Sequence, residues 1–128
     1  MRNDTPLVAV VDDEESVRRA LGRLVRSAGF DVETFSSGID FLRAVGQRRP
    51  SCVVLDLRMP HVNGFDVQHT LKEMDSGLPV VIITGDDSPE SRSRALKQGA
   101  KAYLRKPVDD AMLVDAIQTA ILSGQTAT

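Results

Sequence analysis

The sequence lacks the features that mark several large classes of protein. A single cysteine, Cys52, excludes a disulfide within the chain, so a reducing, cytoplasmic setting is the simplest expectation. No apolar run approaches the ~20 residues needed to cross a bilayer, and the polar start Met1–Asp4 does not begin a signal peptide. The 16 Lys and Arg against 18 Asp and Glu give a net charge of −2, which argues against direct binding of a nucleic-acid backbone.

What the sequence does contain is a regular alternation of two patterns. Short runs rich in Val, Ile and Leu alternate with stretches whose apolar residues have helical spacing. This alternation predicts an α/β fold of (βα)5 type, a doubly wound, five-stranded parallel sheet. The expected strands are Leu7–Val11, Asp31–Phe35, Cys52–Leu55, Val80–Ile83 and Ala102–Leu104. One domain is expected over residues 1–122, with 123–128 as a linker or frayed tail.

Capping residues and helix breakers predict where the helices lie between these strands. The first helix should stop at Gly29, and the expected boundaries of the others are Ser37, Gly64, Gly77, Ser88, Gly99 and Asp109. The apolar residues expected to face the core from the second, third and fifth helices include Ile39, Leu42, Val45, Phe65, Leu71, Met74, Met112, Leu113, Ala116, Ile117, Ala120 and Ile121.

Polar side chains with phosphate and metal chemistry stand where the predicted strands end. Asp12 and Asp13 follow the first strand, Asp56 the third, Thr84 the fourth, and Lys106 the fifth. Ligands of open parallel sheets bind at this edge, so the three acids are expected to converge there. Two carboxylates about 5 Å apart repel by ~3 kcal/mol at an effective dielectric of ~20, which favours a bound Mg²⁺. The set predicts phosphoryl transfer to Asp56 as the nucleophile, with Thr84 and Lys106 binding the phosphoryl oxygens.

Four motifs resemble those of the receiver domains of two-component response regulators. They are Val-Asp-Asp-Glu-Glu at 11–15, Val-Leu-Asp-Leu-Arg-Met-Pro at 54–60, Ile-Thr-Gly at 83–85 and Tyr-Leu-Arg-Lys-Pro at 103–107. The resemblance covers residues 6–122 and is greatest to regulators that carry a C-terminal helix-turn-helix output domain. It implies the flavodoxin-like strand order 2-1-3-4-5 and a cis bond between Lys106 and Pro107.

The resemblance also implies a role for each matching residue. Asp56 would accept a phosphoryl group from a phosphohistidine on a sensor histidine kinase. Mg²⁺ would be bound by Asp13 and Asp56 directly, by Asp12 through water, and by the backbone carbonyl of Arg58. Beyond its own phosphorylation and dephosphorylation, such a domain catalyses nothing, so it is not a conventional enzyme.

The signalling output is likewise expected from the resemblance. Thr84 and Tyr103 would form a switch pair in which the hydroxyl moves to the phosphoryl group and the aromatic ring turns inward, while Lys106 pairs with the phosphoryl oxygens. The fourth helix, fifth strand and fifth helix would then change homodimerisation or contact with an output domain, which is expected to bind DNA and to regulate transcription.

Three other functions remain open on the sequence. A phosphatase of the haloacid dehalogenase kind usually has Asp-x-Asp after its first strand, whereas Asp12 and Asp13 are adjacent. A flavin- or nucleotide-binding module would need a Gly-, Ser- or Thr-rich phosphate loop where this chain is acidic. A receiver that is only a scaffold would not need the complete acceptor set.

Several single features have simple structural interpretations. Asp12 and Asp13 alone could be helix caps, His61 and His69 are expected at the surface, and Cys52 is expected in the core. The first helix carries four arginines, Arg18, Arg19, Arg23 and Arg26. They form either a solvated face or a docking surface for an acidic partner.

Overall fold

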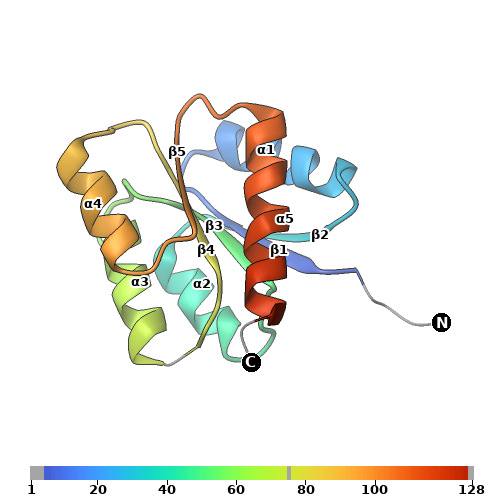
Figure 1. Ribbon diagram of the computed structural model, residues 1–128, viewed down its shortest axis with the longest axis horizontal. Coiled ribbons are helices and arrows are strands. Elements are labelled where there is room, and N and C mark those ends of the chain that lie inside the picture. The colour runs from blue at the N-terminus through green and yellow to red at the C-terminus, as the bar shows by residue number, and fades with distance from the viewer. Residues whose placement is uncertain (1–4, 75, 127–128) are drawn as a thin grey trace.

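The computed structural model describes residues 5–74 and 76–126 and consists of strands and helices in strict alternation (Figure 1). The strands are β1 (Leu7–Val11), β2 (Asp31–Phe35), β3 (Cys52–Asp56), β4 (Val80–Thr84) and β5 (Ala102–Arg105). The helices are α1 (Glu15–Ser27), α2 (Gly38–Val45), α3 (Gly64–Glu73), α4 (Pro89–Lys97) and α5 (Asp110–Thr126). The predicted (βα)5 pattern is therefore confirmed.

The strands form one parallel sheet in the order β2-β1-β3-β4-β5, which confirms the expected topology. β1 pairs on both sides, so that Val8 lies opposite Val32 of β2 and Cys52 of β3. After β2 the chain crosses to the other side of β1 and builds outward to β5. This switch point lies at the carboxyl ends of β1 and β3, the usual ligand position in such sheets.

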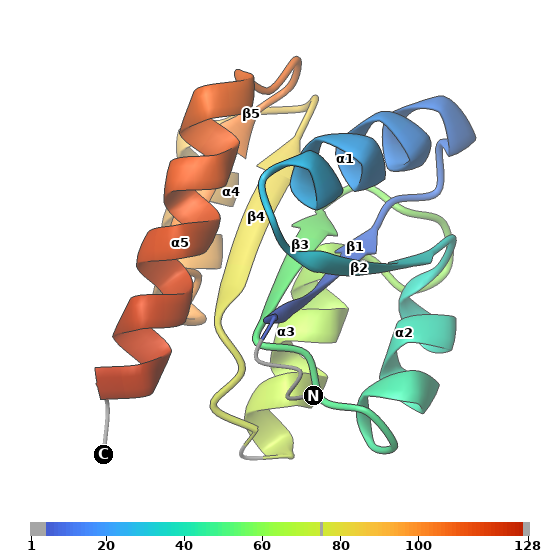
Figure 2. The ribbon, with the colours of Figure 1, turned by 90° about the vertical axis from the view of Figure 1, so that its right-hand side faces the viewer.

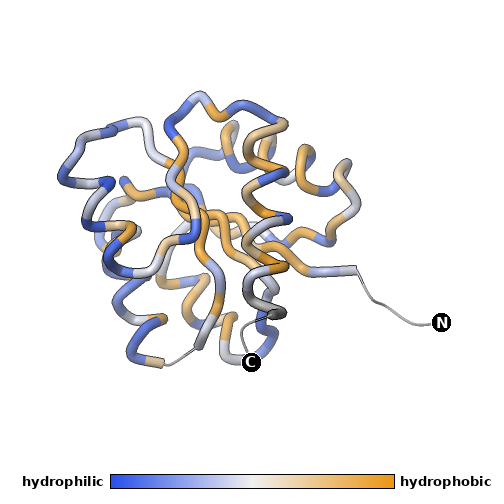
Figure 3. The backbone as a smooth tube through the Cα atoms, viewed as in Figure 1, coloured by the Kyte–Doolittle hydropathy of each residue, from blue (hydrophilic) through white to orange (hydrophobic). Residues whose placement is uncertain are grey.

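Helices cover both faces of the sheet, as Figures 1 and 2 show. α1 and α5 pack on one face, where Val25 and Ile117 meet Val10 and Val54. The other face carries α2, α3 and α4 and has its own apolar cluster, with Phe41 among its buried side chains. Figure 3 shows hydrophobic residues gathered along the central strands, which is why β1, β3 and β4 read as continuous apolar runs.

Side-chain hydroxyls cap two of the helices where the sequence predicted their start. Ser37 Oγ accepts from the Asp40 backbone N–H at 3.1 Å, and Ser88 Oγ accepts from that of Ser91 at 3.0 Å. A full capping box, which was not expected from the sequence, joins Asn63 to Asp66 at the start of α3. In the part of the chain that the structure describes, no helix is long and apolar enough to span a membrane.

Some sequence predictions at the ends of the elements are wrong. Ile39, Met74 and Met112 were expected in the core but are 42%, 48% and 58% exposed. Ile39 and Met112 lie in the first turns of their helices, and Met74 caps the end of α3, where a helix no longer covers the sheet. α5 continues to Thr126, so the linker expected from residue 123 is helical as far as the structure describes it, and residues 127–128 lie outside the described part.

Candidate functional site

The carboxyl edge of the sheet brings together the polar residues that the sequence marked out. Asp56 and Thr84 are the last residues of β3 and β4, and Asp12 directly follows β1. Lys106 follows β5, and its backbone N–H donates to the Thr84 carbonyl at 2.8 Å. The peptide bond between Lys106 and Pro107 is cis, as expected. Since the strands are parallel and adjacent, their ends meet in one place.

Three carboxylates and one ammonium form the centre of this edge. Asp12, Asp13 and Asp56 each offer one oxygen, and these oxygens lie within 4.8 Å of one another. Asp12 and Asp56 are buried, whereas Asp13 is exposed. Lys106 Nζ lies 2.9 Å from Asp12 Oδ2 and 3.3 Å from Asp56 Oδ1. The partly buried Lys106 thus pairs with two of the three acids, and the cluster keeps an excess of negative charge.

This electrostatic imbalance is visible in the ionisation of the two central groups. Burial and, after it, the charge of Asp12 raise the pKa of Asp56 to about 6, although Lys106 acts in the opposite direction. Burial lowers the pKa of Lys106, but the hydrogen bond to Asp12 and the charges of Asp56 and Asp12 outweigh it and raise that pKa. The carboxylate of Asp56 is therefore costly to ionise, while Lys106 stays charged.

Backbone geometry holds the acids in this arrangement. Asp12 Oδ1 accepts from the Glu14 backbone N–H at 2.9 Å, and the cap position of α1 is Glu14, so Asp12 and Asp13 do not cap that helix. Asp56 Oδ1 lies 3.4 Å from the Arg58 backbone N–H. At Gly64 a Cβ atom would come within 2.9 Å of the Asp56 carbonyl oxygen. Only glycine lets α3 begin this close to the end of β3.

An ion pair crosses the edge between two loops. Arg58, two residues after Asp56, places its Nη2 atom 2.8 Å from Oδ2 of Asp86, two residues after Thr84. Both side chains are more than half exposed, so the pair lies at the surface of the site. This contact was not expected from the sequence, because no spacing rule connects residues on separate loops.

The hydroxyl and the aromatic ring expected to form a switch pair are both buried. Thr84 Oγ1 accepts from the Asp86 backbone N–H at 3.1 Å. The Tyr103 ring is 8% exposed, and the Arg92 guanidinium lies 5.7 Å from its centroid. Burial and the neighbouring Asp87 raise the pKa of the Tyr103 hydroxyl. The ring is therefore inward, beside α4, in this structure.

The remaining candidates lie away from the cluster. Cys52 is fully buried, and burial raises the pKa of its thiol to about 12, as suits a core residue. His61 is exposed with a φ of 68°, and His69 lies 3.5 Å from Glu73 on the surface of α3, so both occupy the expected surface positions. The arginines of α1 line a hollow of about 490 Å³ beside Thr34 of β2.

The family follows from comparison with known proteins. Residues 8–118 match the family described as the response regulator receiver domain, a stretch that includes the whole acidic edge. The chain belongs to this family. As a receiver domain of a response regulator, it is a phosphoacceptor switch of two-component signalling.

Named relatives of this receiver domain are longer proteins. Response regulator protein TmoT of Ectopseudomonas mendocina is 39% identical over 121 residues, which cover 94% of this chain and 55% of that protein. Transcriptional regulatory protein TdiR of Thauera aromatica is 40% identical over 114 residues, with 89% and 50% covered. The chain thus spans about half the length of the curated relatives it matches.

Solved structures agree with the fold. The receiver domain of a response regulator from Clostridium thermocellum superposes with a TM-score of 0.90 at 30% identity, covering 96% of this chain and 99% of that one. FixJ-N gives a TM-score of 0.86 at 32% identity, with 95% and 96% covered. StyR, described as a response regulator, gives 0.84 at 40% identity, with 94% and 61% covered.

Proposed function

We propose that Asp56 is the phosphoacceptor of this receiver domain and takes its phosphoryl group from a phosphohistidine of a sensor histidine kinase. The observation that carries this proposal is the buried Asp56 carboxylate at the sheet edge, with Lys106 Nζ 3.3 Å from its Oδ1. Among the acids of the cluster, Asp56 is the one at the end of a central strand, between β1 and β4. Signalling of this kind is cytoplasmic, and we propose that location.

The transfer requires one carboxylate oxygen to attack phosphorus while the bond from phosphorus to the histidine nitrogen breaks. The new bond makes an acyl phosphate on Asp56, and the histidine leaves as a neutral ring once it takes a proton. Asp56 Oδ1 already faces Lys106 and the Arg58 N–H, and we assign the attack to Oδ2. Catalysis by this chain would be confined to forming and hydrolysing its own acyl phosphate.

The donor set suits a magnesium ion. Three carboxylate oxygens lie within 4.8 Å of one another, and two of these acids pair with the partly buried Lys106. Hard oxygen ligands are those that Mg²⁺ prefers. We propose that Asp13 and Asp56 hold the ion directly, Asp12 through water, and Arg58 through its backbone carbonyl. When bound, Mg²⁺ would neutralise charge on the phosphoryl oxygens.

Lys106 and Thr84 would bind the phosphoryl group after transfer. Lys106 Nζ lies within reach of both Asp12 and Asp56, so it can follow the negative charge as it moves onto the phosphoryl oxygens. The Thr84 hydroxyl accepts from the Asp86 N–H and keeps its own proton to donate. We propose that Tyr103, whose ring is buried beside α4, responds to movement of the Thr84 hydroxyl and so couples it to α4.

Mass spectrometry with a small phosphodonor tests the acceptor. Wild-type protein with Mg²⁺ and acetyl phosphate should gain the mass of one phosphoryl group, and Asp56→Asn should gain none. Asp115→Asn is the matched control, because Asp115 is an exposed acid on α5, and it should be labelled like the wild type. Labelling of Asp56→Asn to the wild-type extent, or no labelling of the wild type, would refute the proposal.

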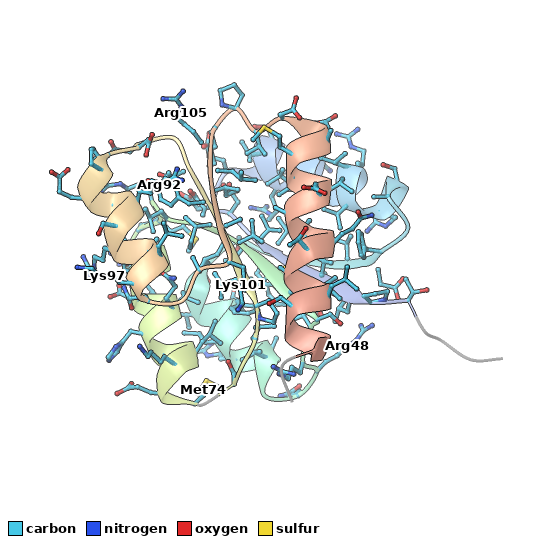
Figure 4. All side chains as sticks on the ribbon, viewed as in Figure 1. Arg48, Met74, Arg92, Lys97, Lys101 and Arg105 are labelled. Atoms are coloured by element: carbon cyan, nitrogen blue, oxygen red, sulfur yellow. The ribbon has the colours of Figure 1, made fainter. Side chains whose placement is uncertain are left out.

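We further propose that phosphorylation controls pairing of copies, or an output domain, through α4, β5 and α5. Figure 4 shows Arg92 and Lys97 on α4, Lys101 just before β5 and Arg105 at its end. α5 carries Asp115 beside a groove of about 390 Å³ between β5 and α5. Basic side chains on α4 and β5 and the acidic Asp115 on α5 would allow opposite charges to meet across a two-fold axis.

A DNA-binding output domain is proposed from the relatives alone. TdiR is described as a transcriptional regulatory protein, and it is about twice as long as the stretch matched here.

Sedimentation with and without beryllium fluoride, a stable mimic of the phosphoryl group, tests pairing of two copies through the face of α4, β5 and α5. A dimer fraction that rises with the mimic in wild type and not in Asp56→Asn is expected, and an unchanged fraction in both would contradict it.

A further inference from the structure

α4 is held in place by unusually little apolar contact. Only Ser91 and Ala95 of this helix are buried, and four of its nine residues are Ser or Arg in the run from Ser91 to Arg94. A helix normally keeps its position by burying one apolar face. The contacts that fix α4 must therefore be sought among polar and aromatic groups.

Two such contacts join α4 to α3. Gln68 of α3 is 2% exposed, and its Nε2 donates to the Ala95 carbonyl of α4 at 3.0 Å. One turn nearer the start of α3, the Arg94 guanidinium stacks 4.1 Å from the centroid of the Phe65 ring. The Ala95 carbonyl also accepts from the Ala100 N–H at 3.1 Å, so Gln68 binds α4 where that helix ends.

The first residue of α3, one position before Phe65, lies against the phosphoacceptor. The Gly64 N–H donates to the Leu57 carbonyl at 3.0 Å, and a Cβ at Gly64 would lie 2.9 Å from the Asp56 carbonyl oxygen. The capping box of Asn63 and Asp66 fixes this first turn. Because the backbone at Asp56 and the start of α3 are in close contact, a shift of the backbone at Asp56 must also move α3.

We propose that α3 is a second link from the phosphoacceptor to α4, parallel to Thr84 and Tyr103, and that Gln68 is its positioning residue. The proposal rests on the function proposed above, since it needs Asp56 to be phosphorylated. Phosphorylation shifts the β3–α3 connection, α3 moves with it, and Gln68 with the Arg94–Phe65 stack carries α4 along. The Gln68 Oε1 atom is buried and has no hydrogen-bond partner among the described residues, so this amide has an acceptor left to satisfy when α4 is repositioned.

The chain allows the two links to be followed separately. Tyr103 is its one tyrosine and it has no tryptophan, so intrinsic fluorescence reports the Tyr103 link. Hydrogen exchange of the α4 amides reports the position of that helix. Both are measured on the 128-residue chain with Mg²⁺, with and without beryllium fluoride. Wild type should respond to the mimic in both signals.

Gln68→Met removes the donor at nearly constant side-chain volume, and Arg94→Ala removes the stack from an exposed position. Each variant should keep the Tyr103 fluorescence response while its α4 exchange response falls by roughly twofold to tenfold, the range of one hydrogen bond. Gln118→Met is the matched control on the exposed side of α5 and should respond as wild type does. Arg94→Ala keeps the proposal testable should Gln68→Met fold poorly.

Two results would overturn the second link. One is a wild-type α4 response in the variants of Gln68 and Arg94. The other is loss of the fluorescence and exchange responses together, which would indicate a single route through Tyr103. Failure of the proposed function looks different, because wild type itself would then show no response to the mimic in either signal.

Discussion

Replacing Asp56 by Asn is expected to stabilise the metal-free protein at neutral pH. Burial, helped by Asp12, raises the pKa of Asp56 from 3.8 to about 6 in the folded state. Each pKa unit corresponds to about 1.4 kcal/mol, so ionised Asp56 destabilises the fold by about 3 kcal/mol relative to its protonated form. Asn keeps an oxygen that can accept from Lys106 and from the Arg58 N–H, but it carries no charge.

The sign of the pH dependence follows from the direction of the shift. A carboxyl whose folded-state pKa is raised contributes stability that is fully present below its unfolded pKa and is lost as pH rises through the folded value. The wild type should lose this contribution between about pH 4 and pH 7, whereas Asp56→Asn has no such group to titrate. The gap in stability between variant and wild type should therefore be small at about pH 4 and largest near pH 8.

Urea or thermal unfolding at these two pH values, with the metal chelated, measures the gap. For a chain of this length about 3 kcal/mol corresponds to a rise in melting temperature of roughly 10 °C. Asp115→Asn, which removes an exposed charge, should stay within about 0.5 kcal/mol of wild type. Added Mg²⁺ should narrow the gap, because it stabilises the wild-type cluster preferentially. Equal gaps at the two pH values, or a less stable variant at the higher one, would refute the reasoning.

Three further predictions follow from other contacts. Gly64→Ala should destabilise the fold by about 1–3 kcal/mol in urea unfolding, because the added Cβ would lie 2.8 Å from the Leu57 Cα atom. Gly46→Ala is the control, since no atom lies within 4 Å of its added Cβ, and equal effects of the two changes would contradict the prediction. Arg58→Ala or Asp86→Ala removes the ion pair over the site and should shorten the lifetime of the phosphorylated form severalfold, because water then reaches the acyl phosphate more easily. The free energy of unfolding should fall by less than about 1 kcal/mol, and an unchanged decay rate in a phosphate-release assay would contradict the prediction. Cys52 should not react with a thiol reagent in the folded protein and should react once urea unfolds the chain, because the side chain is fully buried and its thiol has a pKa of about 12. Rapid reaction of the folded protein would contradict this prediction.

The sequence determined the sheet and the chemistry at its edge. Continuous apolar runs at β1, β3 and β4 leave few alternatives to buried parallel strands, and the alternation with helical spacing requires crossover connections. Polar residues directly after those strands then had to meet, because parallel strands end on one side. For that reason the residue order alone is enough to group Asp12, Asp56, Thr84 and Lys106.

Only the tertiary structure decided how the elements contact one another across space. The Arg58–Asp86 pair, the Arg92 contact with Tyr103 and the Gln68 bond to α4 each join residues from separate elements, and no periodicity connects them. The spacing of apolar residues also did not predict which side chains near the helix ends are exposed, as Ile39 shows. Periodicity records which face of an element is apolar, whereas the packing angle of each helix on the sheet decides where that face stops being covered and which polar side chains meet.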